Sequence, residues 1–319
     1  MAISRSHSIM SAHMDSIDDA EINQPPFAAS AVVTQQTRTL SSNISDDANK
    51  YALTKEPRLY DETTEEQGCT KIRDALTPEE INNMSDPNLV LRHFRADKGD
   101  ITKAIKRTKY AIQWRKDFKV KEMLKAAHDP TTEKEKEIQK ILMKEAKTGK
   151  MFVRGYDNEG RAILYIYQKR ENSNIQEHNI MHLIYQIERA IACTERMGFG
   201  KAVIVLDFDG WRMKHASSLD LTKKTIHILQ DCYVERVAKV YFTNPPGVFR
   251  TFFNMIKVFL DSTTRSKIMF VTAKDRPKME THFNPETAEG CIFGPTNLRE
   301  YNVDDYFAVP LNCSFDEEL

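Results

Sequence analysis

The sequence predicts an α/β protein in which a helical N-terminal module precedes a largely parallel sheet. Strand-like and helix-like segments alternate after Met151, and the continuous apolar run 202–208 is typical of a strand buried on both faces. Helix start signals dominate residues 69–148. Because alternation of this kind favours strand–helix–strand units, most strands are expected to be parallel.

The charge of the chain is unevenly spread, although its formal sum is zero. Residues 1–68 hold 5 Lys/Arg against 11 Asp/Glu, whereas residues 92–125 hold 12 against 4. Such a basic block indicates an anionic partner, nucleic acid or a lipid surface, or else the solvated face of a helix pair.

Cysteine spacing and hydropathy argue against metal frameworks, secretion and a membrane span. The five cysteines form no CxxC pair and no zinc-ligand spacing. No apolar run approaches the ~20 residues that cross a bilayer, and the N-terminus lacks the apolar stretch of a secretory signal. We therefore expect no metal site and a reducing, intracellular compartment.

Two regions precede the expected sheet. Residues 1–68 are polar and without periodicity, which predicts a disordered acidic tail. Residues 69–148 are expected to form helices, because Thr77 and Asp86 each precede a proline at a helix start. Asp100 is expected to cap a further helix in the same module.

Beyond residue 148 the pattern changes to strands and long helices. The expected strands are 151–155, 161–167, 202–208, 237–243 and 267–272, and the expected helices are 175–197, 219–233 and 246–260. The first two strands should form a hairpin around 156–160. We place this α/β domain at 149–295 and a C-terminal extension at 296–319.

Two aspartates end the apolar strand in VLDFDG, and their meaning is open. The motif resembles that of haloacid-dehalogenase-like phosphatases, in which Asp207 would be the nucleophile and Asp209 a general acid beside magnesium. That chemistry needs a second acidic pair, and the pair 304–305 does not follow an apolar strand. The alternative is that Asp207 ends the strand and accepts backbone N–H groups of the next loop.

The segment 245–261 is too apolar for a helix that only lies on a sheet. Its polar residues Arg250, Asn254, Lys257 and Asp261 fall in one stripe, and nearly all other positions are apolar. A surface helix needs an apolar stripe of only about 100°. The additional apolar surface of this helix must be covered by a second partner: another protein element, a lipid or a membrane.

Three consecutive segments around this helix have an ordered pattern. They are YVERVAKVYFTNPP at 233–246, the helix itself, and FLDSTTRSKIMFV at 259–271. This order resembles the CRAL-TRIO lipid-binding domain of phosphatidylinositol transfer proteins, which read Y-P-E-R, a strand ending in Asn-x-Pro, an aromatic gate helix, then F-L-D-x-x-T-x-x-K-I. Upstream, LRHFRADKGDITKAIKRTKYAIQWRKDF at 91–118 is similar to the family's helical module.

The resemblance implies a sheet with helices on one face and a lipid pocket on the other. A gate helix would close over the pocket and touch the membrane when open. The gate residues that it implies are Phe249, Phe252, Phe253, Ile256 and Phe259. The basic module would then be attracted to an anionic membrane, at roughly 1 kcal/mol for each Lys or Arg near the surface.

The resemblance also implies a head-group site for an inositol lipid. Lys267 would bind the phosphate, Thr264 would donate to it, and Glu235 would accept from inositol hydroxyls. The alternative for the two charged residues is an ordinary ion pair at the pocket rim.

Two departures from the family pattern bear on the ligand. A phosphate-contacting Arg of some members aligns with Asp97, so Lys98 or Arg95 would have to substitute for it. Hydroxyl residues that contact choline lipids align with Ala202 and Ile204, which carry no hydroxyl. Phosphatidylcholine is therefore expected to be a poor ligand.

The sequence as a whole predicts a lipid-binding and transfer protein without cofactor or catalytic residues. Phosphatidylinositol is the first ligand expected, and a sterol, tocopherol or retinoid is the alternative within the same class. The aspartate-based phosphatase is the alternative from another class. We expect a cytoplasmic monomer that contacts anionic membranes transiently and binds no nucleic acid.

Overall fold

The computed structural model describes residues 59–212 and 218–317. Most of the expected acidic tail, 1–58, lies outside these residues. Helix α3 spans Glu62–Asp74, so the helical region begins seven residues before the expected boundary at Cys69. The reason is local, because the Asp61 side chain accepts the Thr64 N–H at 2.9 Å and so caps the helix.

The described part of the N-terminal module is helical, as predicted. After α3 it contains α4 Pro78–Asn83, α5 Leu89–Ala96, α6 Ile101–Phe118, α7 Val120–His128 and α8 Glu133–Ala146. Thr77 and Glu80 form the capping box of α4, and Asp100 caps α6 by accepting the Lys103 N–H. The apolar sides of α3, α5 and α6 meet in one buried cluster around Phe94.

A five-stranded sheet forms the centre of the second domain within the described residues. Its strands are β1 Met151–Tyr156, β2 Ala162–Tyr167, β3 Ala202–Asp207, β4 Val237–Thr243 and β5 Ile268–Val271. Strands β1 and β2 form the predicted antiparallel hairpin, and the pairs β2–β3, β3–β4 and β4–β5 are parallel. The largely parallel α/β architecture is thus confirmed.

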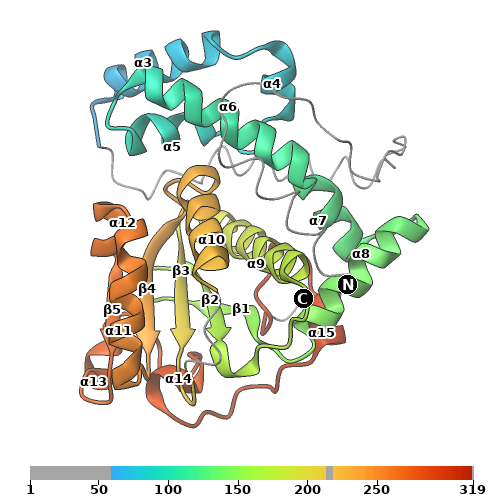
Figure 1. Ribbon diagram of the computed structural model, residues 1–319, viewed down its shortest axis with the longest axis vertical. Helices are drawn as coiled ribbons and strands as arrows, with labels where there is room; N and C mark the ends of the chain where they lie inside the picture. The colour runs from blue at the N-terminus through green and yellow to red at the C-terminus, as the bar shows by residue number, and fades with distance from the viewer. Residues whose placement is uncertain (1–58, 213–217, 318–319) are drawn as a thin grey trace, which may run out of the picture. The chain divides into compact units, whose positions relative to one another are not determined.

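Three helical connections join the parallel strands and can be followed in Figure 1. They are α9 Gln176–Arg196, α10 Leu219–Cys232, and the segment made of α11 Gly247–Ile256, the 3₁₀ helix η3 Lys257–Phe259 and α12 Ser262–Ser266. The strands follow one another in sequence order across the sheet. Right-handed connections therefore place α9, α10 and α11 on the same face.

The opposite face is covered by the chain that follows β5. The Tyr241 ring packs on Phe283 at 5.0 Å between centroids, and the Tyr165 hydroxyl accepts the Glu289 N–H at 3.2 Å. This part of the chain also contains the short helices α13 Arg276–Met279, α14 Gly290–Phe293 and α15 Val303–Ala308. The resemblance implied helices on one face and a pocket closed by the gate helix on the other; the structure instead has α9 and α10 on the same face as the gate helix α11, and the cavity lies on that face.

A buried ion-pair network attaches the helical module to the sheet domain. Asp86, which precedes α5, lies 2.6 Å from Arg236 and 3.2 Å from Arg92. Glu195 of α9 lies 2.6 Å from Arg236 and 3.9 Å from Arg92. We call these four residues the docking network; it contains two cations and two carboxylates.

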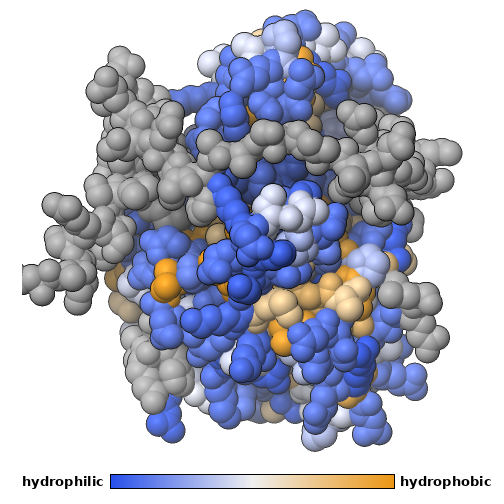
Figure 2. Space-filling model, turned by 90° about the vertical axis from the view of Figure 1, so that its right-hand side faces the viewer, coloured by the Kyte–Doolittle hydropathy of each residue, from blue (hydrophilic) through white to orange (hydrophobic). Residues whose placement is uncertain are grey.

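Two surface properties complete the description. None of the helices within residues 59–212 and 218–317 has the length and apolarity needed to cross a membrane. The described part of the face seen in Figure 2 is mostly hydrophilic, with a group of hydrophobic residues near its centre and smaller hydrophobic areas elsewhere.

Candidate functional site

A cavity of about 770 Å³ lies between the sheet and the helices on its α9–α11 face. Its floor follows the strand register, in which Leu164, Ile204, Val240 and Ile268 are successive neighbours across β2 to β5. Residues two positions further along β3 and β4, Leu206 and Phe242, also line it. Because side chains alternate between the faces of a sheet, one apolar face supplies the whole floor.

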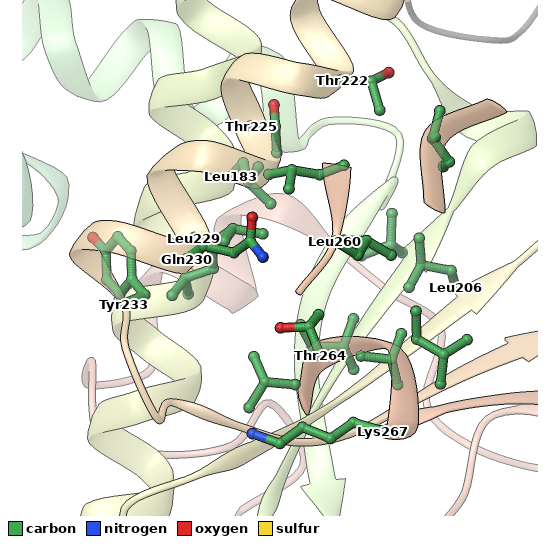
Figure 3. Close-up of a pocket in the computed structure, with 18 of the residues that line it drawn as sticks. Leu183, Leu206, Thr222, Thr225, Leu229, Gln230, Tyr233, Leu260, Thr264 and Lys267 are labelled. Carbon is green, nitrogen blue, oxygen red and sulfur yellow. The ribbon is translucent and has the colours of Figure 1, made fainter. Parts of the chain in front are cut away.

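Apolar side chains from three helices form the walls, and Figure 3 shows Leu183 and Leu229 among them. The wall residues are Ile180, Leu183 and Ile187 from α9, Leu221, Ile226 and Leu229 from α10, and Phe249, Phe252, Phe253 and Ile256 from α11. A cavity of this size and lining suits the hydrocarbon part of a ligand.

Helix α11 and η3 have two apolar sides with different surroundings. On the inner side Phe249 is 1% exposed and its ring lies 3.9 Å from that of Phe208. On the outer side Val258 is 69% exposed and Phe259 37% exposed. Four of the five predicted gate residues therefore line the cavity, whereas Phe259 faces outward. The excess apolar surface seen in the sequence is divided between the cavity and the exterior.

Glu235 and Lys267, both expected at the head-group site, line the cavity and face each other. Their Oε1 and Nζ atoms are 4.0 Å apart, and Lys201 Nζ lies 2.8 Å from Glu235 Oε2. Burial raises the pKa of Glu235, but the charges of Lys267 and Lys201 outweigh this and leave the pKa below its ordinary value. The carboxylate is therefore ionised at neutral pH. Its backbone has a φ of 55°, so the chain turns sharply there.

Thr264 lies beside Lys267 at the same end of the cavity, and Figure 3 shows its hydroxyl directed toward Gln230. The Thr264 hydroxyl donates to Asp261 Oδ2 at 2.7 Å, and Gln230 Nε2 donates to the same oxygen at 2.6 Å. Asp261 also accepts the Thr264 backbone N–H and caps α12. The expected head-group donor is thus engaged with a carboxylate.

The helical module contributes cations to the same end. Asp97 is buried and binds Arg107 at 2.7 Å and Lys103 at 3.3 Å, and both cations line the cavity. Lys98 also lines it, whereas Arg95 forms a two-bond ion pair with Glu65. Of the two expected substitutes for the family Arg, only Lys98 is placed at the cavity.

Sequence reasoning missed Arg107, Lys103 and Gln230. The first two lie four positions apart on α6 and therefore on one face of the helix. They were missed because lysine and arginine occur throughout this block and no pattern distinguishes these two. Gln230 gave no signal, because an isolated Gln on a helix is ordinary.

Cations outnumber carboxylates among the described residues that line the cavity. They are Lys98, Lys103, Arg107, Lys150, Arg236 and Lys267, against Glu171, Asp231, Glu235 and Asp261. Arg236 is bound by Asp86 and Glu195, and Arg107 and Lys103 are bound by the buried Asp97, so these cations have carboxylate partners behind the lining. A charged cluster of this kind suits a polar ligand group.

The two residues that bear on choline lipids differ in position. Ile204 lies in the floor of the cavity, whereas Ala202 is buried at the start of β3 and does not belong to the described residues that line it. Of these two residues, only Ile204 lies where the absence of a hydroxyl would affect contact with a choline lipid.

The two strand-end aspartates have separate surroundings. Asp207 Oδ1 accepts the Asp209 N–H at 3.2 Å, the Thr243 hydroxyl at 3.1 Å and the Asn244 amide at 2.8 Å. This confirms its predicted role as a cap of the following loop. Asp209 is exposed, with Lys169 at 3.9 Å. Within the described ranges, no group of three or more His, Cys, Asp and Glu residues could hold a metal ion.

The fold and the cavity together define an α/β domain that holds an apolar cavity between a largely parallel sheet and the helices on one of its faces. Residues 146–290 match the family model of the CRAL/TRIO domain. The chain therefore contains a CRAL-TRIO domain, as the resemblance in sequence predicted. The crystal structure of Sfh5 has the same fold, with a TM-score of 0.53 and 18% identity over 70% of this chain and 85% of that one.

Curated relatives extend the similarity into the helical module. A CRAL-TRIO domain-containing protein of Schizosaccharomyces pombe is 31% identical over 68% of this chain and 20% of its own length. The phosphatidylinositol transfer protein PDR17 of Saccharomyces cerevisiae is 28% identical over 64% of this chain and 56% of its own. This chain thus spans a fifth and just over half of these two relatives. The SEC14 cytosolic factor of Candida glabrata is 25% identical over 74% of this chain and 80% of its own.

Proposed function

We propose that this protein binds one anionic phospholipid, phosphatidylinositol in the first place, and carries it between membranes. The observation that carries the proposal is an apolar cavity that ends in a cluster of charged residues, with Lys98 and Lys267 among its cations. A similar protein, PDR17, bears the name phosphatidylinositol transfer protein, and this supports the choice of lipid.

The head group decides which lipid is held. Moving acyl chains from a bilayer into an apolar cavity exchanges one apolar environment for another, so the ~0.8 kcal/mol gained per buried CH₂ largely cancels. The difference must then come from polar contacts. We assign the lipid phosphate to Lys267, as a point charge, and the inositol hydroxyls to the ionised Glu235; the position of both residues in the cavity lining supports this assignment.

Transfer between vesicles tests this proposal. Lys267→Ala should lower transfer of labelled phosphatidylinositol at least about tenfold, since a charge-assisted bond contributes about 1.5–3 kcal/mol. Lys274→Ala, which removes an exposed lysine away from the cavity, is the control and should leave transfer unchanged. Unchanged transfer by the Lys267 variant would contradict the head-group assignment.

The same assay tests lipid choice. Phosphatidylcholine should move more slowly than phosphatidylinositol, because Ile204 offers no hydroxyl on the cavity floor. Equal rates would show that the cavity does not select by head group. A carrier of a sterol, tocopherol or retinoid would leave the charged end without a ligand group, and mass spectrometry of co-purified lipid separates it from a phospholipid carrier.

The outer side of the gate is proposed to contact the membrane. Val248, Met255, Val258 and Phe259 are exposed, and Lys223 Nζ lies 6.0 Å from the Phe259 ring centroid. Apolar side chains beside a cation suit insertion into an anionic bilayer surface.

Sedimentation with anionic vesicles tests the membrane contact. Val258→Ser should weaken vesicle binding several-fold, because it removes one apolar side chain from the inserted surface. Ile81→Ser is the control, since Ile81 is similarly exposed on α4 in the helical module. Equal binding by the two variants would show that the gate is not the contact.

Location and domain limits belong to the same proposal. We place the protein in the cytoplasm as a monomer that associates peripherally with membranes, which agrees with the name of the relative called SEC14 cytosolic factor. The lipid-binding domain is taken as 149–295, preceded by the helical module.

A further inference from the structure

An aromatic cluster bounds the cavity at the carboxyl ends of β3 and β4. Phe208 directly follows β3, and Phe249 lies in the first turn of α11, which follows β4. Trp211 completes the cluster, and all three residues line the cavity. Their exposed fractions are 5%, 1% and 4% in this order, so the rings form a closed wall and not the rim of an opening.

The turn after β3 brings Trp211 back over the end of the strand. Asp207 Oδ1 accepts the Asp209 N–H at 3.2 Å, and the Trp211 N–H donates to the Phe208 carbonyl at 3.0 Å. Gly210 has a φ of 65°, in the left-handed region that favours glycine. The sequence DFDGW therefore places an indole ring at the cavity.

The rings of the cluster hold one another in place. The centroid of the Phe249 ring lies 3.9 Å from that of Phe208 and 5.5 Å from that of Trp211, and the second pair is perpendicular, at 90°. The ring of Phe252, which also lines the cavity, lies 5.7 Å from that of Trp211. Because close-packed interiors yield little, this wall is a fixed limit of the cavity.

The aromatic cluster and the charged residues lie at opposite ends of the cavity. Lys267 directly precedes β5 and Glu235 lies two residues before β4, whereas the cluster follows the carboxyl ends of β3 and β4. These strands are parallel, so the two groups belong to opposite edges of the sheet. In Figure 3 the Lys267 ammonium points away from Leu206, the cavity residue two positions before Phe208.

The separation of the two ends suits an acyl chain. Strand β4 has seven residues, and a strand of that length spans about 20 Å. Each leaflet of a bilayer gives its acyl chains about 15 Å, half of a hydrocarbon thickness of about 30 Å. A lipid whose head group lies near Lys267 therefore has chain ends that come close to the cluster.

The lining beside the cluster, after β2, is polar. Gln168, Glu171 and Asn179 contribute to it, and the Lys150 ammonium donates to Glu171 Oε1 at 2.7 Å. A hydrocarbon chain that covers such groups removes them from water without offering a hydrogen bond, which is unfavourable. The aromatic cluster is therefore the better surface for the chain ends.

We propose that Trp211, backed by Phe208 and Phe249, stops the ends of the acyl chains and sets the longest chain that the cavity accepts. The inference rests on the proposed function, because the head group fixes the other end of the lipid. Selection by chain length is then separate from selection by head group.

Loading from a series of chain lengths tests the proposal. The full-length protein is equilibrated with fluid vesicles that contain equal amounts of phosphatidylinositol species with chains from lauroyl to behenoyl, and mass spectrometry identifies the species loaded. Beyond one chain length, which we call the length limit, loading by the wild-type protein should fall at least about tenfold at the next species. The reason is that each CH₂ group kept out of an apolar environment lowers loading about fourfold.

Three variants locate the wall. Trp211→Leu opens space at the cluster and should move the length limit to longer chains by at least one species. Leu206→Phe fills the neighbouring lining position and should move it to shorter chains. Phe283→Leu is the control, because this ring is buried against Tyr241 and is not among the described residues that line the cavity. It should leave the length limit unchanged.

The contrary results are separable. A wild-type protein that loads all chain lengths alike would overturn the proposal, as would a length limit that stays the same in folded Trp211→Leu. If thermal unfolding shows that this variant does not fold, an unchanged limit in Leu206→Phe overturns the proposal instead. An equal shift in Phe283→Leu would assign the limit to general loosening and not to the wall. A wild-type protein that loads no phosphatidylinositol of any chain length would refute the proposed function and, with it, this inference.

Discussion

Two neighbouring residues, Glu235 and Arg236, belong to two charged regions with different surroundings. Arg236 belongs to the docking network, is 8% exposed and is bound by Asp86 and Glu195. Its neighbour Glu235 faces the cavity between Lys201 and Lys267. The cations and carboxylates of the docking network are buried and bind one another, whereas Glu235 and Lys267 line the cavity. The first arrangement joins two parts of the protein, and the second leaves charged groups at a cavity.

Removing one carboxylate from the docking network should have the largest effect on stability. Asp86→Ala leaves Arg92 and Arg236 with Glu195 as their shared carboxylate. Loss of one partner from a buried ion pair costs about 3–5 kcal/mol, so the free energy of unfolding in urea should fall by that amount.

A cation of the cavity end provides the matched control. Lys103 is 60% exposed, and Asp97 keeps Arg107 when Lys103 is lost. Lys103→Ala should therefore change the free energy of unfolding by less than about 1 kcal/mol. Similar losses in the two variants would remove the distinction between the regions.

Acid titration of the docking network should have a smaller effect. Burial raises the pKa of Asp86, but Arg236 and Arg92 lower it further, to about 2 from an ordinary 3.8. Since the folded-state pKa is depressed, its stabilising contribution is present above about pH 4 and is lost as the pH falls through 2. The contribution is about 2 kcal/mol at 1.36 kcal/mol per pKa unit.

Urea unfolding between about pH 5 and 2 measures this contribution. The free energy of unfolding of the wild-type protein should fall by about 2 kcal/mol more than that of Asp86→Asn, which has no carboxyl group to titrate. Parallel pH profiles for the two proteins would show that Asp86 is not held by its two arginines.

Much of the fold could be predicted because it depends on local pattern. Every strand begins and ends within a residue or two of its expected limits. Alternating apolar residues indicate a strand with one buried face, and continuous apolar runs indicate a strand with two. The capping residues Thr77 and Asp100 were predicted for the same reason. The start of α3 was missed although its cap, Asp61, is a local signal, because the charged first turn resembles the polar tail before it.

The candidate site was predicted in part. The resemblance to the CRAL-TRIO family implied Glu235 and Lys267, and both line the cavity near the amino ends of β4 and β5, while their head-group role stays a prediction. Arg107 and Gln230 could not be found in this way. Their place at the cavity depends on how α6 and α10 pack, which no local pattern records.

The sequence by itself determined the elements of this protein, its domain family, and the double apolar character of the gate helix. Those properties follow from residue periodicity and from an ordered motif along one stretch of chain. Only the tertiary structure decided which sheet face forms the cavity, which aspartate is a loop cap, and that Gln230 binds Asp261 at the cavity end. Each of these depends on contacts between segments that are distant in sequence, such as Asp207 with Asn244.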